Sequence, residues 1–225
     1  KLYFVLLYTY KLNKKNTINI GAVYTLGRTL HGDAYKYHQT GAESNGSIYV
    51  QSQTGDTIPN PFKMPHTFGI GLTYVYDNRL TIGVDYTLQK WNTADLAWSK
   101  FNKESVEMNS RTKIAFGAEF VPSYISHNYL KRIRYRMGAY YSSPYNKVSY
   151  TSPDTGTTSF QDGAREYGVS IGFGLPMFQS KSMLNISGQY IKVSPKFKGL
   201  MEENYLRINI GLTFNERWFM KWKVD

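Results

Sequence analysis

Hydrophobic and polar residues alternate along most of this chain. Between Leu206 and Phe214 an apolar residue occupies every second position, and Arg, Asn, Gly and Thr stand between them. A period of two predicts a β-strand with two unlike faces. The pattern recurs in stretches of about ten residues or a little longer, the length that a tilted strand needs to cross a bilayer. Nine such strands are predicted, at 2–12, 17–29, 67–76, 80–90, 111–121, 129–141, 164–175, 182–193 and 206–214.

The connections between these strands alternate between short and long. The short ones are 13–16, 77–79, 122–128 and 176–181, and the longer ones are 30–65, 91–110, 142–163 and 194–203. Outer-membrane barrels combine short periplasmic turns with long extracellular loops in this way. We therefore expect an all-β fold, an antiparallel transmembrane β-barrel in the bacterial outer membrane, with the last strand ending in the periplasm. A soluble β-sandwich is the alternative, but such a fold would not explain why short and long connections alternate along the chain.

Two of the long connections are predicted to lack regular structure. The first, 30–65, ends in a segment with three prolines, which forbid a regular ladder of hydrogen bonds. The other, 142–163, is rich in Ser, Thr, Pro, Gly and Tyr, which predicts a mobile loop.

Composition agrees with a barrel and excludes a helical membrane protein. Only 41% of the 225 residues are hydrophobic, and no apolar run approaches the roughly 18 residues of a helical span. Aromatic residues make up 16%, and Tyr and Trp are typical of a membrane interface. We expect such an anchor at the periplasmic interface, formed by Trp218, Phe219 and Trp222 among neighbouring cations.

The net charge of +11 predicts anionic partners. The chain contains no nucleic-acid-binding motif, so we expect outer-membrane lipid and lipopolysaccharide, and not nucleic acid, to attract the basic residues.

The strand count suggests that the chain is part of a longer barrel. With this loop order the first strand begins on the outer side, whereas single-chain barrels have an even number of strands and both ends inside. We therefore expect residues 1–225 to be a single barrel domain that lacks an odd number of N-terminal strands.

Several segments carry a resemblance to a known family. They are PFKMP (61–65), FGIGLTY (68–74), DNRLTIGVDY (77–86), QKW (89–91), YRMGAY (135–140), EYGVSIGFGLP (166–176) and NERWF (215–219). These sequence segments resemble those of the FadL-like outer-membrane transport barrels. The resemblance implies 14 strands, passage of hydrophobic small molecules such as fatty acids, and an N-terminal hatch outside this chain.

Charged residues are predicted to gather on the inward faces of neighbouring strands. These lumen-facing candidates are Asp85, Lys113, Glu119, Arg132, Arg134, Arg136, Glu166 and Arg207. We expect Glu119 to lie roughly opposite Arg132, as an attractive cross-strand pair. The set can form a polar pathway for a ligand, or a lattice of ion pairs that fills a closed lumen.

No residue pattern indicates catalysis or a resident metal. The four histidines share no ligand spacing, and no nucleophile motif is present. We expect a protein without enzymatic activity, metal or cofactor, although an outer-membrane hydrolase is a third, weaker alternative.

Two functional hypotheses follow. The first is a barrel that binds or passes a hydrophobic, fatty-acid-like molecule. The alternative is a structural barrel subunit, with protein partners, of a larger outer-membrane complex for secretion, assembly or lipid handling.

Overall fold

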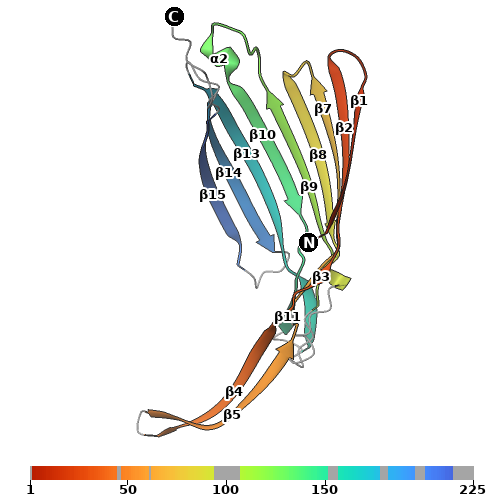
Figure 1. Ribbon diagram of the computed structural model, residues 1–225. Coiled ribbons are helices and arrows are strands. Elements are labelled where there is room, and N and C mark those ends of the chain that lie inside the picture. The colour runs from red at the N-terminus through yellow and green to blue at the C-terminus, as the bar shows by residue number, and fades with distance from the viewer. Residues whose placement is uncertain are drawn as a thin grey trace, which may run out of the picture.

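One antiparallel sheet dominates the structure, a computed structural model that describes residues 2–44, 47–60, 62–93, 107–151, 157–177, 182–195 and 201–214 (Figure 1). Nine long strands lie in it in chain order, so the nine predicted strands are confirmed. They are β1 (Tyr3–Lys11), β2 (Asn16–Thr25), β7 (Thr67–Tyr76), β8 (Leu80–Gln89), β9 (Arg111–Phe120), β10 (Arg134–Ser142), β13 (Ala164–Pro176), β14 (Met183–Pro195) and β15 (Glu203–Thr213).

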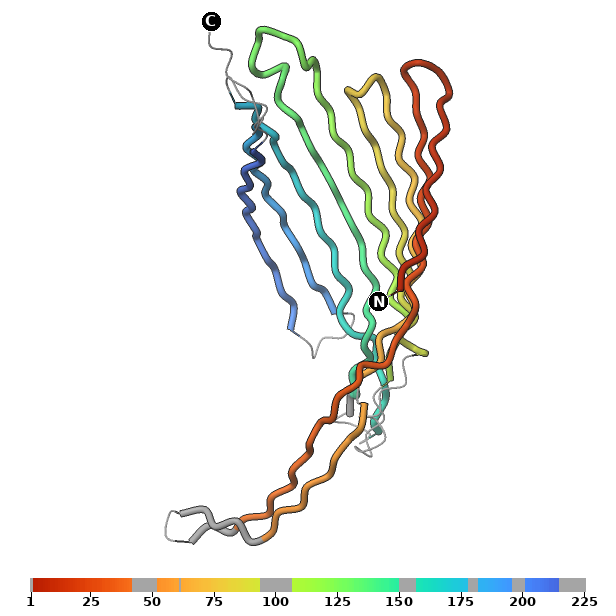
Figure 2. Tube along the Cα trace, in the orientation of Figure 1, coloured from red at the N-terminus to blue at the C-terminus, as the bar shows by residue number. Residues whose placement is uncertain are grey.

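The sheet is an open, hollowed wall and not a closed ring (Figure 2). β1 forms one edge and β15 forms the other, and these two strands do not pair with each other. The all-β antiparallel architecture is therefore confirmed, while closure into a barrel stays a prediction.

The two ends of the sheet differ, as the loop lengths predicted. At one end the strands are joined mainly by short turns, here called the short-turn end. At the opposite end, the loop end, lie the strands and helix of the long connections (Figure 1). They are β3 (Arg28–Thr29) with β6 (Lys63–Met64), β4 (Asp33–Ser44) with β5 (Ser47–Pro59), the 3-10 helix η1 (Trp91–Thr93), and β11 (Lys147–Thr151) with β12 (Thr158–Asp162).

The prediction of a long polar loop over 30–65 was wrong, because β4 and β5 pair along their length into an arm that extends from the loop end (Figure 1). Pro59 ends β5 and Pro65 follows β6, so these prolines interrupt no ladder. The connection 142–163 contains the β11–β12 hairpin, and its mobility stays a prediction.

Local side chains explain the tight turns at the short-turn end. Asp77 and Asn78 take φ of 49° and 53° between β7 and β8, a left-handed conformation that Asp and Asn tolerate. In the β1–β2 turn the Asn13 side-chain oxygen accepts hydrogen bonds from the backbone N–H groups of Lys15 (2.9 Å) and Asn16 (2.8 Å).

The strand predicted at 129–141 begins later than expected. Residues Tyr129–Arg132 form the short helix α2, whose first turn is capped by the Asn128 side chain, which accepts a hydrogen bond from the Leu130 N–H at 3.0 Å. β10 therefore starts at Arg134.

A single layer of strands leaves the protein almost without a core. Among the described residues few apolar side chains are buried: Ile58, Val121, Ile133 and Ile191, with Pro65 and Pro144. The chain exposes 17059 Å², whereas a compact soluble monomer of 25.9 kDa exposes about 10,500 Å². No helix within the described ranges is long and apolar enough to cross a membrane.

Candidate functional site

The pairing register gives the sheet two chemically opposite faces. One row of paired residues, with one residue from each of the nine strands, is entirely apolar: Tyr8, Ile20, Leu72, Val84, Phe116, Ala139, Val169, Tyr190 and Leu206. The next row along the strands points to the other side and is polar or glycine throughout: Thr9, Asn19, Thr73, Gly83, Gly117, Gly138, Ser170, Gln189 and Arg207.

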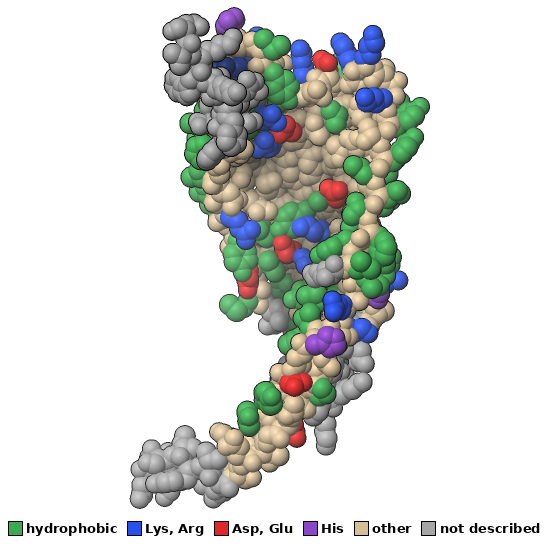
Figure 3. Space-filling view, viewed as in Figure 1, with side chains coloured by type: hydrophobic (Ala, Val, Ile, Leu, Met, Phe, Trp, Pro, Cys, Tyr) green, Lys and Arg blue, Asp and Glu red, His purple; other side chains and the backbone are tan. Residues whose placement is uncertain are grey.

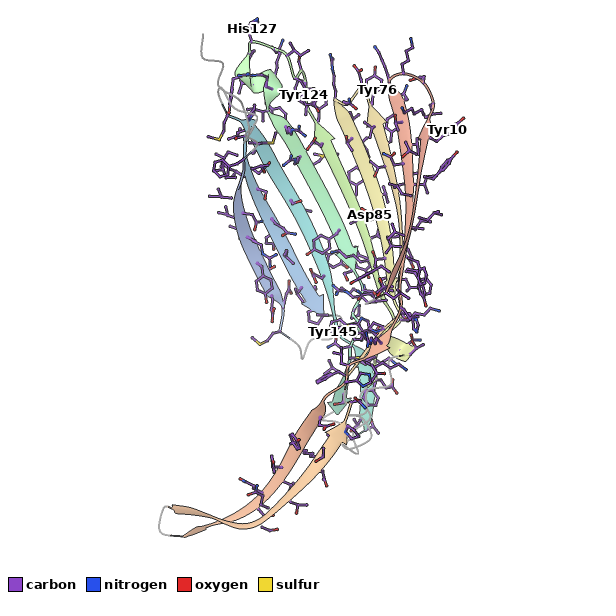
Figure 4. The ribbon with its side chains drawn as sticks, viewed as in Figure 1. Tyr10, Tyr76, Asp85, Tyr124, His127 and Tyr145 are labelled. Carbon is purple, nitrogen blue, oxygen red and sulfur yellow. The ribbon has the colours of Figure 1, made fainter. Side chains whose placement is uncertain are left out.

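The apolar rows lie on the outer, convex face. Tyr10 belongs to this face and points away from the hollow (Figure 4). Closer to the short-turn end a further row is apolar on seven successive strands and rich in aromatic rings: Tyr76, Leu80, Phe120, Tyr135, Phe173, Ile186 and Ile210. An exposed apolar band bordered by aromatic residues is typical of the lipid-facing side of a membrane sheet.

The polar rows line the concave face, which Figure 3 shows as a hollow with few apolar side chains at its centre. Asp85 lies on this face (Figure 4), where it covers the site at which a Gly71 side chain would stand: a Cβ there would be 2.4 Å from the Asp85 Oδ1. Most of the charged side chains of this face gather in two clusters.

The first cluster lies toward the short-turn end and centres on Glu119. Its carboxylate accepts hydrogen bonds from the Arg134 Nη1 at 3.1 Å and the Arg136 Nε at 2.6 Å. Arg136 also donates from Nη1 to the Asn185 Oδ1 at 2.8 Å. This bond spans β13, where Gly172 and Gly174 carry no side chain to obstruct it. We call these four residues the Glu119 cluster.

The second cluster lies at the loop end and centres on Glu166. Its carboxylate accepts a hydrogen bond from the Tyr140 hydroxyl at 2.5 Å and lies 3.5 Å from the Arg111 guanidinium. Arg111 also donates to the hydroxyl of the buried Ser142 at 2.7 Å. The Lys113 ammonium lies 4.4 Å from the centre of the Tyr140 ring. These contacts join β9, β10 and β13.

Replacing Gly168 with Ala should break this second cluster. A Cβ at Gly168 would stand 2.0 Å from the Tyr140 Cε1, so the ring must move away and its hydroxyl loses Glu166. We expect the free energy of unfolding to fall by about 1–2 kcal/mol, the cost of one charge-assisted hydrogen bond with its packing. Gly188→Ala is the matched control, because nothing lies within 4 Å of its Cβ. Equal urea midpoints for the two variants would contradict the role assigned to Tyr140.

The structure brings together five of the eight predicted lumen-facing charges. Glu119, Arg134 and Arg136 share one cluster, and Lys113 and Glu166 share the other. Asp85 stands on β8 and Arg207 on the edge strand β15, where Arg207 is near enough to Tyr140 to interact with it electrostatically. The pairing of Glu119 with Arg132 was wrong, because Arg132 belongs to α2 and Arg136 is the residue opposite Glu119. That these charges face a lumen stays a prediction, as the sheet is open.

Four participants were missed from the sequence, and one of them, Arg111, shares the period-two face of Lys113 in β9. Tyr140 and Ser142 follow Arg134 and Arg136 at even spacing in β10 and so share their face, a signal that could have found them. Asn185 was placed inward, but its contact with Arg136 depends on the strand order and could not be read from one strand. The anchor residues Trp218, Phe219 and Trp222 lie outside the described residues.

No group of three or more His, Asp or Glu side chains in the described part of the chain is arranged to hold a metal ion. The two clusters consist of mutually satisfied ion pairs and hydrogen bonds. The arrangement therefore favours support of the wall over chemistry on a substrate.

Comparisons with known proteins overturn the resemblance to FadL-like transporters. A family model described as BamG matches residues 1–225. No curated protein and no solved structure matches the chain. The FadL resemblance was therefore wrong, and the total of 14 strands, which came from it, loses its support. This family indicates association with the outer membrane and an assembly-related subunit with protein partners, which supports the structural-subunit hypothesis better than fatty-acid transport.

Proposed function

Because the chain belongs to the BamG family, we propose that it is a non-enzymatic, membrane-embedded subunit of an outer-membrane assembly complex, with its β-sheet as a transmembrane wall. Its partners are other proteins of that complex, and lipid surrounds its convex face.

The convex face is the observation that carries this proposal. Apolar residues are exposed on every one of the nine strands, for example Leu72 at 49%, Val169 at 55% and Leu206 at 77%. Leaving such a surface in water is unfavourable by roughly 25 cal/mol for each Å². Strands of nine to 13 residues have the length that a tilted crossing of the hydrocarbon core needs.

The concave face supports a structural role. Glu119 is satisfied by two arginines, and Glu166 by Arg111 and Tyr140, so the carboxylates of both clusters are already engaged within the sheet. Carboxylates that are held by cations of the same sheet favour the lattice of ion pairs over a pathway for a ligand, although cations outnumber carboxylates in both clusters.

The two edge strands, β1 and β15, need further strands to pair with them in a membrane. Among the strands that the structure describes, none lies beside the outer side of β1 or of β15. Hydrocarbon provides no hydrogen-bonding partner, so each unpaired N–H or C=O there costs several kcal/mol. We therefore place further strands at both edges, from the barrel itself or from a partner.

Depletion of the protein tests this proposal. We expect the folded fraction of other outer-membrane barrels, measured by the electrophoretic shift between heated and unheated samples, to fall, because assembly loses a subunit. Uptake of radiolabelled long-chain fatty acid, divided by the amount of folded outer-membrane barrel protein that remains, should stay unchanged. Normal folding of other barrels after depletion would refute the proposal.

A further inference from the structure

Two adjoining pockets lie on the convex face, and neither belongs to the charge clusters described above. The first is an apolar groove of about 470 Å³ over β1, β2, β7 and β8. The second is a pocket of about 380 Å³ at the loop end, beside β6 and η1. Tyr24 and Phe68 line both, so the two form one elongated site that runs from the loop end toward the middle of the wall.

The groove provides an apolar surface that extends across β1, β2, β7 and β8. Its walls include Phe4, Leu6, Ile70 and Tyr86, and the small side chain of Ala22 lies between them. Phe4, Leu6 and Ile70 are 56%, 69% and 57% exposed, so only the hydrocarbon part of a ligand or of the bilayer can satisfy them. The volume lies in the range of small-molecule sites in proteins.

The loop-end pocket has the opposite chemistry. Lys63, His66, Lys90 and Thr93 line it, with the ammonium of Lys90 5.5 Å from the centre of the Phe68 ring. None of the described residues that line either pocket is acidic. Two cations beside an apolar groove suit a phosphate joined to an acyl chain, while the Thr93 hydroxyl is already engaged with the Lys90 carbonyl at 2.9 Å.

His66 is held in a defined position in this pocket. Its Nδ1 accepts a hydrogen bond from the Gly27 N–H at 3.3 Å and lies 2.7 Å from the Tyr24 hydroxyl, with the two rings stacked at 5.9 Å. Because the Gly27 N–H can only donate, Nδ1 is an acceptor and the ring proton is on Nε2. A Cβ at Gly27 would lie 2.8 Å from the Met64 carbonyl oxygen, so only glycine fits beneath the ring.

We propose that this site binds a phosphate-bearing acyl lipid of the membrane, with one acyl chain in the groove and a phosphate between Lys63 and Lys90. The inference rests on the proposed function in one respect, that the convex face lies in the bilayer. There the loop end is at headgroup level and the groove is at the depth of the acyl chains, which matches the order of charge and apolarity in the site.

Titration of the full-length protein in detergent with diphosphorylated lipid A, followed by native mass spectrometry, tests the site. We expect the Lys63→Ala/Lys90→Ala double variant to bind lipid A about thirtyfold more weakly than the wild type, since each lysine near a lipid surface contributes about 1 kcal/mol. Ala22→Trp, which fills the groove without changing charge, should also weaken binding. Lys63→Arg/Lys90→Arg should restore most of it.

The matched control removes the same charge at the opposite end of the wall. Lys14→Ala/Lys15→Ala changes two exposed lysines of the β1–β2 turn and should bind lipid A as the wild type does. Equal binding by the wild type and the Lys63/Lys90 variant, or equal losses in that variant and the control, would overturn the proposal. The titration is independent of the depletion experiment, so failure of the lipid site and failure of the assembly role are distinguishable.

Discussion

We expect Leu72→Arg to lower the free energy of unfolding of the membrane-folded protein by about 2–4 kcal/mol, the depth-dependent cost of an arginine on the lipid face of a membrane sheet. Leu72 stands in the apolar row that crosses all nine strands, on β7, with Ile20 and Val84 as its neighbours in the row. No carboxylate occupies this row to pair with a new guanidinium.

The adjacent residue provides the control for this substitution. Thr73 follows Leu72 in β7 but points to the concave face, between Asn19 and Gly83. Thr73→Arg should therefore cost about 1 kcal/mol or less, because its guanidinium reaches polar groups and water. Urea unfolding from phospholipid vesicles, followed by tryptophan fluorescence, measures both variants. Equal costs would mean that the convex face does not lie in lipid.

The second large effect is expected for Glu119→Ala. This change leaves Arg134 and Arg136 without their shared carboxylate, at side-chain exposures of 32% and 38%. Because both cations stay partly accessible to water, we expect a loss of about 1–3 kcal/mol in the free energy of unfolding, less than for a fully buried pair.

Glu107→Ala is the matched control for the ion pair. Glu107 lies 2.6 Å from the Lys147 ammonium but is 46% exposed, so its removal should cost less than about 1 kcal/mol. The same urea titration is repeated in 0.05 M and in 1 M salt. The higher salt concentration should reduce the free-energy cost of Glu107→Ala more than that of Glu119→Ala, since salt screens exposed ion pairs. A Glu119→Ala cost at or below that of Glu107→Ala would refute the structural role of the Glu119 cluster.

Alternation of apolar and polar residues was sufficient to predict the nine strands and their faces. Most strands have a period of two, which Val5 and Leu7 interrupt in β1, and the register keeps that period aligned across the sheet. The expected pairing of Glu119 with Arg132 was displaced by four residues, because α2 lengthens the β9–β10 connection. An even displacement leaves every side chain on the same face, so the faces were predicted correctly even though the partner was not.

The arm and the site contacts could not be predicted in the same way. β4 and β5 are rich in Ser, Thr, Gln and Gly, and their pairing depends on matching along the whole hairpin and not on apolar alternation. The Arg136–Asn185 bond joins strands that are separated by β13, which no single-strand pattern shows.

The FadL resemblance misled for a physical reason. Its segments consist of glycines facing one side, apolar and aromatic residues facing the other, and turn residues such as Asp77 and Asn78. These features meet the demands of a two-faced sheet in general, so they do not distinguish one family from another.

The row of Gly83, Gly117 and Gly138 gives the wall a mechanical property. Three neighbouring strands, β8, β9 and β10, carry no side chain at this level of the concave face. Backbone torsions are least restricted at glycine, so we expect the sheet to curve more easily across these three strands than it would with larger side chains at this level.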